Sequence, residues 1–174
     1  MITRLATLTK WTRDHGWTRG AELGLSLGWL TFNLLKNCPD LFLVCVDPWV
    51  YVPGSVAGGD KCYRTNWDHQ RRERAWRTAS KQWPDRYDLL NMTTDEAAAL
   101  VDDRSLDFVF VDADHSEAGV RADIENWRPK LKPGGWLIGH DIHLPGVNAA
   151  VNALCPEFRT AADNVWYLPK GTMQ

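Results

Sequence analysis

The chain has 174 residues and a mass of 19.8 kDa, which is enough for one domain with a proper hydrophobic core. Hydrophobic residues make up 44% of it and charged residues 24%, and this composition excludes a disordered or fibrous protein. Its 20 Lys and Arg against 22 Asp and Glu leave a net charge of −2, so the charge predicts no general attraction to nucleic acid or to an anionic membrane.

The cysteines and the apolar runs indicate the compartment. Cys38, Cys45, Cys62 and Cys155 form no Cys-x-x-Cys pair, which favours reduced thiols over a zinc site or a disulfide framework. The charged residues that begin at Arg4 argue against a secretion signal, and the apolar runs are too short to cross a bilayer. We therefore expect a cytoplasmic protein with no membrane partner.

The first part of the chain predicts helix, strand, helix and strand in turn. Apolar residues at helical spacing over residues 1–16 indicate an N-terminal helix that ends at Gly16. A strand is expected over 17–23, a helix over 29–37 and a second strand over 41–46. The last of these segments is apolar without alternation, as is typical of a parallel strand covered on both faces.

The rest of the chain continues this alternation. Residues 48–86, a Gly- and Pro-rich loop followed by a helix over 65–82, are interpreted as a lid-like insertion. Residues 131–135 are expected to form a turn. Further strands are expected at 86–91, 106–111, 136–139 and 165–168, and further helices at 93–101 (opening with a capping box), 117–127 and 147–154.

Alternating strands and helices predict an α/β fold. The expected architecture is a Rossmann-like three-layer sandwich with a central, mostly parallel sheet and an N-terminal helix laid against it. Ligands of such sheets bind outside the carboxyl ends of the strands, where the strand order reverses. The candidate functional residues are therefore sought at this edge.

Acids and glycines follow the first two expected strands. Glu22 precedes Gly24 and Gly28, which lie where a strand turns into a helix. Glycine there lets the backbone approach a ligand, and the helix N-terminus favours a carboxylate or phosphate. Asp47 closes the second strand about twenty residues later, where an acid can bind ribose hydroxyls. The pattern favours nucleoside-type binding, and the alternative is that the glycines only form a turn.

The segment Ala21-Glu22-Leu23-Gly24-x-x-x-Gly28 resembles motif I of class I S-adenosylmethionine-dependent methyltransferases. Four later segments are similar to further motifs of this family in the same order: Asp47-Pro48-Trp49, Asn91-Met92-Thr93, Asp107 to His115, and Leu131-Lys132-Pro133-Gly134-Gly135. The segments 112–116 and 139–141 are most similar to small bacterial and phage enzymes related to macrocin-type and catechol-type O-methyltransferases.

The resemblance covers residues 19–153 and implies that 1–174 is a single methyltransferase domain. It implies S-adenosylmethionine as the cofactor, a small-molecule acceptor, and methylation of a hydroxyl oxygen. The cofactor-binding residues that it implies are Glu22, Gly24 and Gly28 at the methionine half, Asp47 at the ribose, Met92 and Thr93 at the adenine, and Asp112 and Asp114.

Two clusters of acids and histidines follow the strands expected at 106–111 and 136–139. They are Asp112, Asp114 and His115 after the first strand, and His140, Asp141 and His143 after the second. If these strands are neighbours, the clusters meet at one edge, where two carboxylates beside imidazoles suit Mg²⁺ or another divalent cation.

In metal-dependent relatives the acids at the positions of Asp112 and Asp141 hold the ion, and a third ligand directly follows the latter. Here that place is Ile142, which cannot bind a metal. Three alternatives stay open: the ion keeps an extra water, His143 or His140 replaces the missing ligand, or no metal binds. The predicted metal site is Asp112, Asp141 and His143.

The predicted catalytic residues are His115 and Asp141. In relatives, a lysine at the position of His115 takes the proton of the acceptor hydroxyl, and an imidazole with a pKa of about 6.5 can do so at neutral pH. Asp141, with or without an ion, would hold the acceptor and lower its pKa. The alternative for His115 is a structural one, in which it caps the helix that begins near Ser116.

The helix over 65–82 has a basic face and a face bearing tryptophans. The two faces are Arg74, Arg77 and Lys81, and Trp76, Ala79 and Trp83. The favoured interpretation is an amphipathic helix whose tryptophans pack on the sheet; the alternative is an electropositive flap that recruits the acceptor.

Two other functions are kept as alternatives. A nicotinamide-dependent oxidoreductase would need a Gly-x-Gly-x-x-Gly fingerprint, which the sequence lacks. A cofactor-binding or nucleic-acid-associated module without catalysis would keep the pocket, although the negative net charge argues against nucleic acid. The sequence predicts no oligomeric state.

Overall fold

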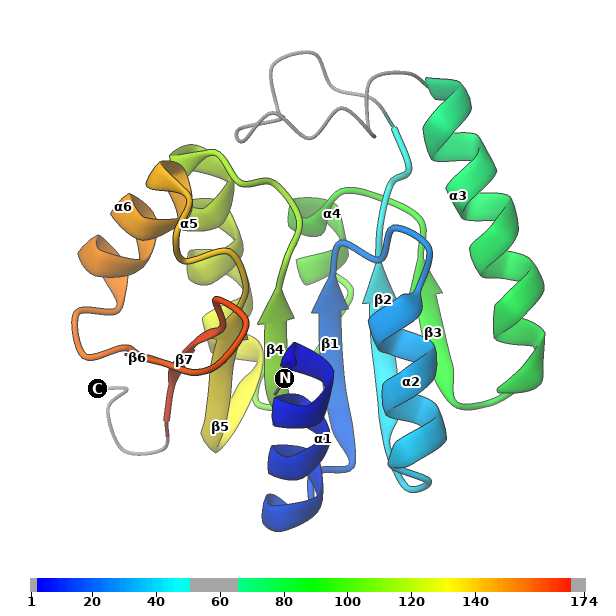
Figure 1. Cartoon of the computed structure of the whole chain (residues 1–174), viewed down its shortest axis with the longest axis horizontal. Coiled ribbons are helices and arrows are strands. Elements are labelled where there is room, and N and C mark those ends of the chain that lie inside the picture. Colours follow the sequence, from blue (N-terminus) through cyan, green and yellow to red (C-terminus); the bar gives the residue numbers. More distant parts are fainter. Residues whose placement is uncertain (1–2, 51–65, 170–174) are drawn as a thin grey trace.

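A computed structural model describes residues 3–50 and 66–169 and contains a seven-stranded sheet with helices on both faces (Figure 1). The strands are β1 (Arg19–Leu23), β2 (Phe42–Val46), β3 (Tyr87–Leu90), β4 (Leu106–Val111), β5 (Leu131–Gly139), β6 (Arg159–Thr160) and β7 (Trp166–Leu168). The helices are α1 (Arg4–His15), α2 (Trp29–Asn37), α3 (Asn66–Ala79), α4 (Thr94–Ala98), α5 (Glu117–Trp127) and α6 (Pro145–Leu154), with 3-10 turns η2 (Ser80–Gln82) and η3 (Arg128–Lys130).

The strand order is β3-β2-β1-β4-β5-β7-β6. Strands β1 to β5 are parallel, and β7 is antiparallel to both β5 and β6. The chain moves outward from β1 to β2 and β3 and then returns to place β4 on the other side of β1, so the strand order reverses between β1 and β4. The predicted mostly parallel α/β sandwich is confirmed, and the edge at which such sheets commonly bind ligands is formed here by the tips of β1, β2, β4 and β5.

Two hydrophobic layers cover the sheet. One face packs against α1, α2 and α3 through buried residues such as Leu8, Leu34 and Trp76. The opposite face packs against α4, α5 and α6, with Ile124 and Val151 among the buried residues. Strand β2 lies between these layers, and its sequence is apolar without alternation, as is typical of a parallel strand covered on both faces.

Helix α1 ends as predicted at Gly16, which adopts the left-handed conformation (φ 63°) and closes the helix. Trp11 on α1 packs against Trp136 of β5 and Tyr167 of β7, with ring centroids 5.3 and 4.7 Å apart respectively. These contacts hold α1 against the sheet, with its first turn nearer the strand tips than its last (Figure 1).

The structure corrects two boundaries and adds one short strand. Strand β5 begins at Leu131, so the turn predicted over 131–135 belongs to the strand. The β4–β5 register shifts between Leu106 and Phe108, an irregularity that accommodates the Pro-Gly-Gly sequence of residues 133–135 inside a strand. Helix α4 ends at Ala98 and not near residue 101, and the two-residue strand β6 was not predicted.

The favoured interpretation of the helix over 65–82 is confirmed for its described part. Trp76 is fully buried, whereas Arg74, Arg77 and Lys81 are exposed. Within the expected lid-like insertion, residues 51–65 lie outside the described residues. In the described part of the chain, Cys38, Cys45 and Cys155 are buried free thiols, and no helix there has the length and apolar character needed to span a membrane.

Candidate active site

The turn after β1 passes directly over the chain that leaves β4. Gly24 has φ 87°, and a Cβ atom at this position would overlap the carbonyl oxygen of Asp112. Gly28 has φ 78°, and a Cβ atom there would press on the side chains of Trp76 and Phe32. Both glycines of the predicted cofactor motif are therefore required by close packing as well as by backbone conformation.

Glu22 is a buried acid beneath this turn, with 4% of its surface exposed. Thr31 on α2 donates a hydrogen bond to its Oε2 atom over 2.7 Å. The pKa of Glu22 is raised to about 8, mainly by burial and also by the nearby acids Asp112 and Asp47, while the hydrogen bond from Thr31 and the charge of Arg4 lower it. Glu22 is thus protonated at neutral pH until a cation approaches it.

Asp47 joins the tip of β2 to the turn after β1. Its Oδ2 atom accepts hydrogen bonds from the amides of Leu25 and Ser26, both at 2.9 Å, and its Oδ1 atom accepts one from Trp49 at 2.8 Å. Burial raises the pKa of Asp47, while these three amides lower it. The predicted ribose acid therefore also holds the glycine turn in place, a role that the spacing did not reveal.

The segment predicted to contact adenine follows β3. Asn91 donates its side-chain amide to the carbonyl oxygen of Asp47 over 3.0 Å, and Met92 packs partly buried against the core. Thr93 and Glu96 form the predicted capping box of α4. The Thr93 hydroxyl is hydrogen-bonded to Glu96, so the adenine contact stays a prediction for this segment.

The tips of β4 and β5 bring together four side chains that we call the acid–imidazole cluster: Asp112, His115, His140 and Asp141. Nε2 of His115 lies 3.1 Å from Oδ2 of Asp141 and 3.5 Å from Oδ1 of Asp112. Nδ1 of His140 lies 3.1 Å from Oδ1 of Asp141 and 3.6 Å from Oδ1 of Asp112. Each imidazole is therefore close to both carboxylates.

Charge pairing within this cluster shifts the pKa of three of its members. The nearby carboxylates of Asp112 and Asp141 raise the pKa of His115 to about 10, although burial lowers it. Burial lowers the pKa of His140, but the same two acids outweigh it and raise the value to about 9. Burial raises the pKa of Asp141, but both histidines outweigh that effect and hold it well below its usual value. The carboxylate of Asp141 thus favours the protonated form of both imidazoles.

The other residues predicted around this cluster have different positions. Asp114 accepts hydrogen bonds from the amide and hydroxyl of Ser116 at 3.0 and 2.7 Å, and Ser116 caps α5. The alternative in which His115 caps this helix is therefore wrong. His143 is half exposed, with Nδ1 3.8 Å from Oδ1 of Asp141.

The donor set suits a divalent cation, but with a different histidine from the predicted one. Each of three residues offers one possible ligand atom, and these atoms all lie within 4.8 Å of one another: a carboxylate oxygen of Asp112, an imidazole nitrogen of His115 and a carboxylate oxygen of Asp141. Two carboxylate oxygens and one imidazole nitrogen are ligands that Mg²⁺ or a softer divalent metal accepts. The structure thus groups His115 with the two acids, while His143 lies at the edge of the cluster.

Sequence reasoning did not find two contacts of this site. They are the hydrogen bond from Thr31 to Glu22 and the contact of Arg4 with His140. Both Thr31 and Arg4 lie on helices, outside the motifs found in the sequence. Nη1 of Arg4, the first residue of α1, lies 3.2 Å from each ring nitrogen of His140. No signal in the sequence connects these residues, because only the packing of α1 and α2 on the sheet brings them to the rim.

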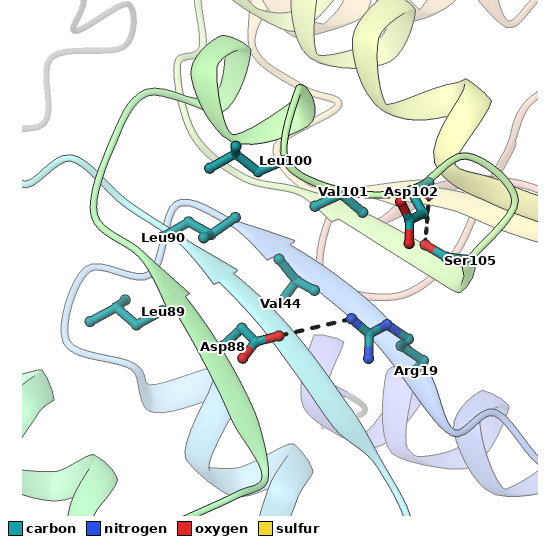
Figure 2. Close-up of a pocket in the computed structure, with 9 residues that line it drawn as sticks. All are labelled: Arg19, Val44, Asp88, Leu89, Leu90, Leu100, Val101, Asp102 and Ser105. Atoms are coloured by element: carbon teal, nitrogen blue, oxygen red, sulfur yellow. Dashed lines mark hydrogen bonds and ion pairs between the residues drawn. The ribbon is translucent and has the colours of Figure 1, made fainter.

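A separate cavity of about 410 Å³ lies away from this rim. Figure 2 shows it beside β2 and β3, below the loop that follows α4, with Arg19 and Asp88 paired across its floor at 3.9 Å. Its lining includes Leu89 and Leu90 of β3, which are only partly buried. None of the predicted site residues lines it.

A protein family described as "Methyltransferase domain" matches residues 21–142 of this chain. An uncharacterized protein of Sinorhizobium fredii, y4gI, is 43% identical over 56 residues, which are 32% of this chain and 6% of that protein. The chain thus spans only a small fraction of the length of this curated relative.

Solved structures share the fold. The methyltransferase PaMTH1 of Podospora anserina, bound to SAH, has a TM-score of 0.71 at 13% identity over 96% of this chain and 77% of its own. A putative caffeoyl-CoA O-methyltransferase of Staphylococcus aureus has a TM-score of 0.70 at 14% identity, over 96% of this chain and 82% of its own. The O-methyltransferase NovP has a TM-score of 0.68 at 15% identity, over 95% of this chain and 77% of its own. With its family match covering more than half of the sequence, the chain belongs to the methyltransferase-domain family, as its resemblance to class I S-adenosylmethionine-dependent methyltransferases predicted.

Proposed function

We propose that this protein transfers the methyl group of S-adenosylmethionine to a hydroxyl oxygen of a small molecule. The observation that carries the proposal is the acid–imidazole cluster beside the glycine turn, at the edge where the strand order reverses. The fold neighbours support it, since two of them are described as O-methyltransferases and one as bound to SAH. The family match disfavours the nicotinamide-dependent alternative.

The turn after β1 would hold the methionine half of the cofactor, with Asp47 near the ribose and the segment after β3 near the adenine. Glu22 and Asp112 are acids close to this turn, and they complement the positive charges of the ammonium and sulfonium groups. The sulfonium already activates the methyl group for transfer. The protein must therefore align the acceptor with it and remove one proton from the acceptor.

His115 is the proposed base, with Asp141 as the residue that orients it. The high pKa of His115 sets a condition on this role, because an imidazolium cannot accept a proton. Binding the positively charged cofactor beside the cluster lowers the pKa of the histidine and favours its neutral form. We expect kcat/KM to rise with pH on the alkaline side of neutrality, and the His115→Gln variant to lose this rise together with most of its activity.

A divalent cation would be held by Asp112 and Asp141, with His115 or His143 as the third ligand. Bound there, it would supply a positive charge that lowers the pKa of the acceptor hydroxyl. It would compete with the protons of His115 and His140 for the same carboxylates, so its affinity would increase with pH.

Calorimetric titration of the chain with S-adenosylmethionine and with NAD tests the proposed function, in the presence of Mg²⁺ and again in the presence of a chelator. We expect binding of S-adenosylmethionine and none of NAD. Methyl transfer to a panel of hydroxylated acceptors then separates an enzyme from a non-catalytic module. Failure to bind S-adenosylmethionine would remove the proposal, whereas binding unaffected by the chelator would remove only the cation.

The third metal ligand is tested by comparing His115→Ala with His143→Ala. Titration with Mn²⁺, followed by the relaxation of solvent water protons, reports ion binding without any turnover. If His115 is the ligand, its variant binds Mn²⁺ at least about 10-fold more weakly and the His143 variant is unchanged. The reverse result would assign His143 as the ligand and free His115 to act as the base.

A further inference from the structure

Arg4 places a guanidinium group between the tip of β5 and the start of α2. Its Nη1 atom lies 3.2 Å from both ring nitrogens of His140, and its Cζ atom lies 6.0 Å from the ring centroid of Trp29. Trp29 is the first residue of α2 and directly follows Gly28 of the glycine turn. The guanidinium therefore adjoins the part of the rim where the methionine half of the cofactor would lie.

Part of the hydrogen-bonding capacity of this guanidinium is unused. Its Nε atom is buried and has no hydrogen-bond partner. None of the ion pairs among residues 3–50 and 66–169 includes Arg4, and the pKa of the neighbouring acid Glu22 is raised to about 8. Arginine has five N–H donors and stays charged, and a partly buried cation without a carboxylate is costly. The position is thus suited to an anion that arrives with a ligand.

Arg4 is held firmly at the start of α1. Its amide donates a hydrogen bond to Oδ2 of Asp163 over 2.9 Å, and Thr3 caps the helix. Further along the helix, Leu8 is fully buried and Trp11 packs against Trp136. A guanidinium positioned before the ligand binds loses little conformational freedom on binding, so its contact with an anion is strengthened.

The first turn of α2 favours an anion at the same place. No side chain caps this helix, and its first turn contains no acidic residue. The hydroxyl of Thr31, in that turn, is directed to Glu22 instead. The free amides and the helix dipole therefore present positive charge toward the rim, from the element next to the Arg4 guanidinium.

We propose that Arg4, together with the first turn of α2, binds the α-carboxylate of the methionine moiety of the cofactor. Asp112, whose main chain contacts Gly24 at the tip of β4, would take the ammonium group, so the two charges of the amino acid are recognised separately. Arg4 is thus a cofactor-positioning residue contributed by the N-terminal helix, outside every motif of the methyltransferase resemblance. This inference rests on the proposed function.

The test compares two ligands that differ only in the carboxylate. Calorimetry measures the binding of S-adenosylhomocysteine and of its decarboxylated amine to the full chain and to Arg4→Gln. We expect the variant to bind S-adenosylhomocysteine about 10- to 100-fold more weakly, as for the loss of a charged hydrogen-bonded pair. Its affinity for the decarboxylated ligand should stay the same or increase. Arg4→Lys, which keeps the charge but not the planar fork, should be intermediate.

Arg13→Gln is the matched control. Arg13 is also on α1, but its guanidinium bonds the carbonyl oxygen of Asn37, at the far end of α2 from the rim. This variant loosens the contact between the two helices without removing charge from the site, so both ligands should bind as in the wild type. Thermal unfolding of each variant without ligand reports any general loss of structure.

Three results would overturn the inference. Equal weakening of both ligands by Arg4→Gln would make the residue structural only. Unchanged affinity for S-adenosylhomocysteine would place the carboxylate elsewhere. If the wild-type chain binds neither ligand, the proposed function fails and this inference fails with it. The first two results, in contrast, overturn the inference while the wild-type chain still binds the cofactor.

Discussion

The two halves of the rim use their acids differently. Beside β1 and β2, Glu22 is buried and neutral, and Asp47 accepts hydrogen bonds from three main-chain amides. Beside β4 and β5, Asp112 and Asp141 instead face imidazoles and lie 18–20% exposed. The acids of the first half therefore stabilise the turn beside which a cofactor would bind, whereas those of the second half remain partly exposed and can take part in proton transfer. Variants of the two halves should fail in different ways.

The largest effect is expected at Asp141. The Asn variant is the appropriate test, because residue 141 has φ 55° and asparagine tolerates this conformation. Losing the carboxylate that faces both histidines should lower the methyl-transfer rate by about 10²- to 10⁴-fold, while cofactor affinity changes by less than about two-fold. Single-turnover rates and calorimetry measure the two quantities. A large loss of cofactor affinity would contradict the division between the two halves.

The next effect concerns the shape of the cofactor half. Gly24→Ala introduces a Cβ atom against the main chain of Asp112 at φ 87°, so we expect it to lower the free energy of unfolding by about 3 kcal/mol and to abolish cofactor binding. Gly16→Ala is the control, since its φ of 63° is also positive but no atom lies within 4 Å of the added Cβ. The Gly16→Ala variant should lower the free energy of unfolding by only about 1 kcal/mol. Equal losses in urea unfolding would show that close packing at Gly24 is unimportant.

Asp47 tests whether an acid of the cofactor half also supports the fold. Asp47→Ala removes the acceptor of three backbone amides, so the ligand-free protein should lose about 2 kcal/mol of unfolding free energy. Asp88→Ala on the neighbouring strand removes only an exposed ion pair with Arg19 and should change stability by less than about 0.5 kcal/mol. If Asp47 served the ribose alone, the two ligand-free variants would have the same stability in urea unfolding.

The smallest effect is a dependence of stability on pH. Since folding raises the pKa of Glu22 from 4.5 to about 8, the folded chain binds more protons than the unfolded chain between these values. Its contribution to stability is complete below about pH 4.5 and is lost as the pH rises toward 8. Between pH 6 and pH 7 the wild type should lose about 1 kcal/mol more than Glu22→Gln in urea unfolding.

Asp123, another buried acid with a pKa raised to about 7, contributes a slope of the same sign. It is present in both proteins of this comparison, so the difference between wild type and Glu22→Gln isolates the contribution of Glu22. Identical slopes would mean that Glu22 is ionised in the folded chain.

Much of the fold and the outline of the site could be predicted from local sequence. Apolar runs of strand length, such as 106–111, alternate with helices that begin at caps such as Ser116 and Thr93 and end at residues such as Gly16. These signals act over a few residues, so they survive without knowledge of the tertiary structure. Parallel strands also present their carboxyl ends to one edge, so the acids after successive strands were expected to converge.

The start of β5 depends on a neighbouring strand. Leu131 pairs with Leu106 and Trp136 with Phe108, so the segment between them, with Pro133 and Gly134, is held within the strand by pairing on either side. The propensity of Gly and Pro for turns is overridden there by pairing that no local window contains.

The sequence by itself determined the alternation of strands and helices, the glycine turn and the acids that follow the strands, because each depends on residues close together in the chain. Only the tertiary structure decided which groups meet: His115 with both acids, Asp47 with the amides of the glycine turn, and Arg4 with the tip of β5. These contacts join residues up to 136 positions apart. Their geometry follows from how helices pack on the sheet, which depends on the whole core and not on any one segment.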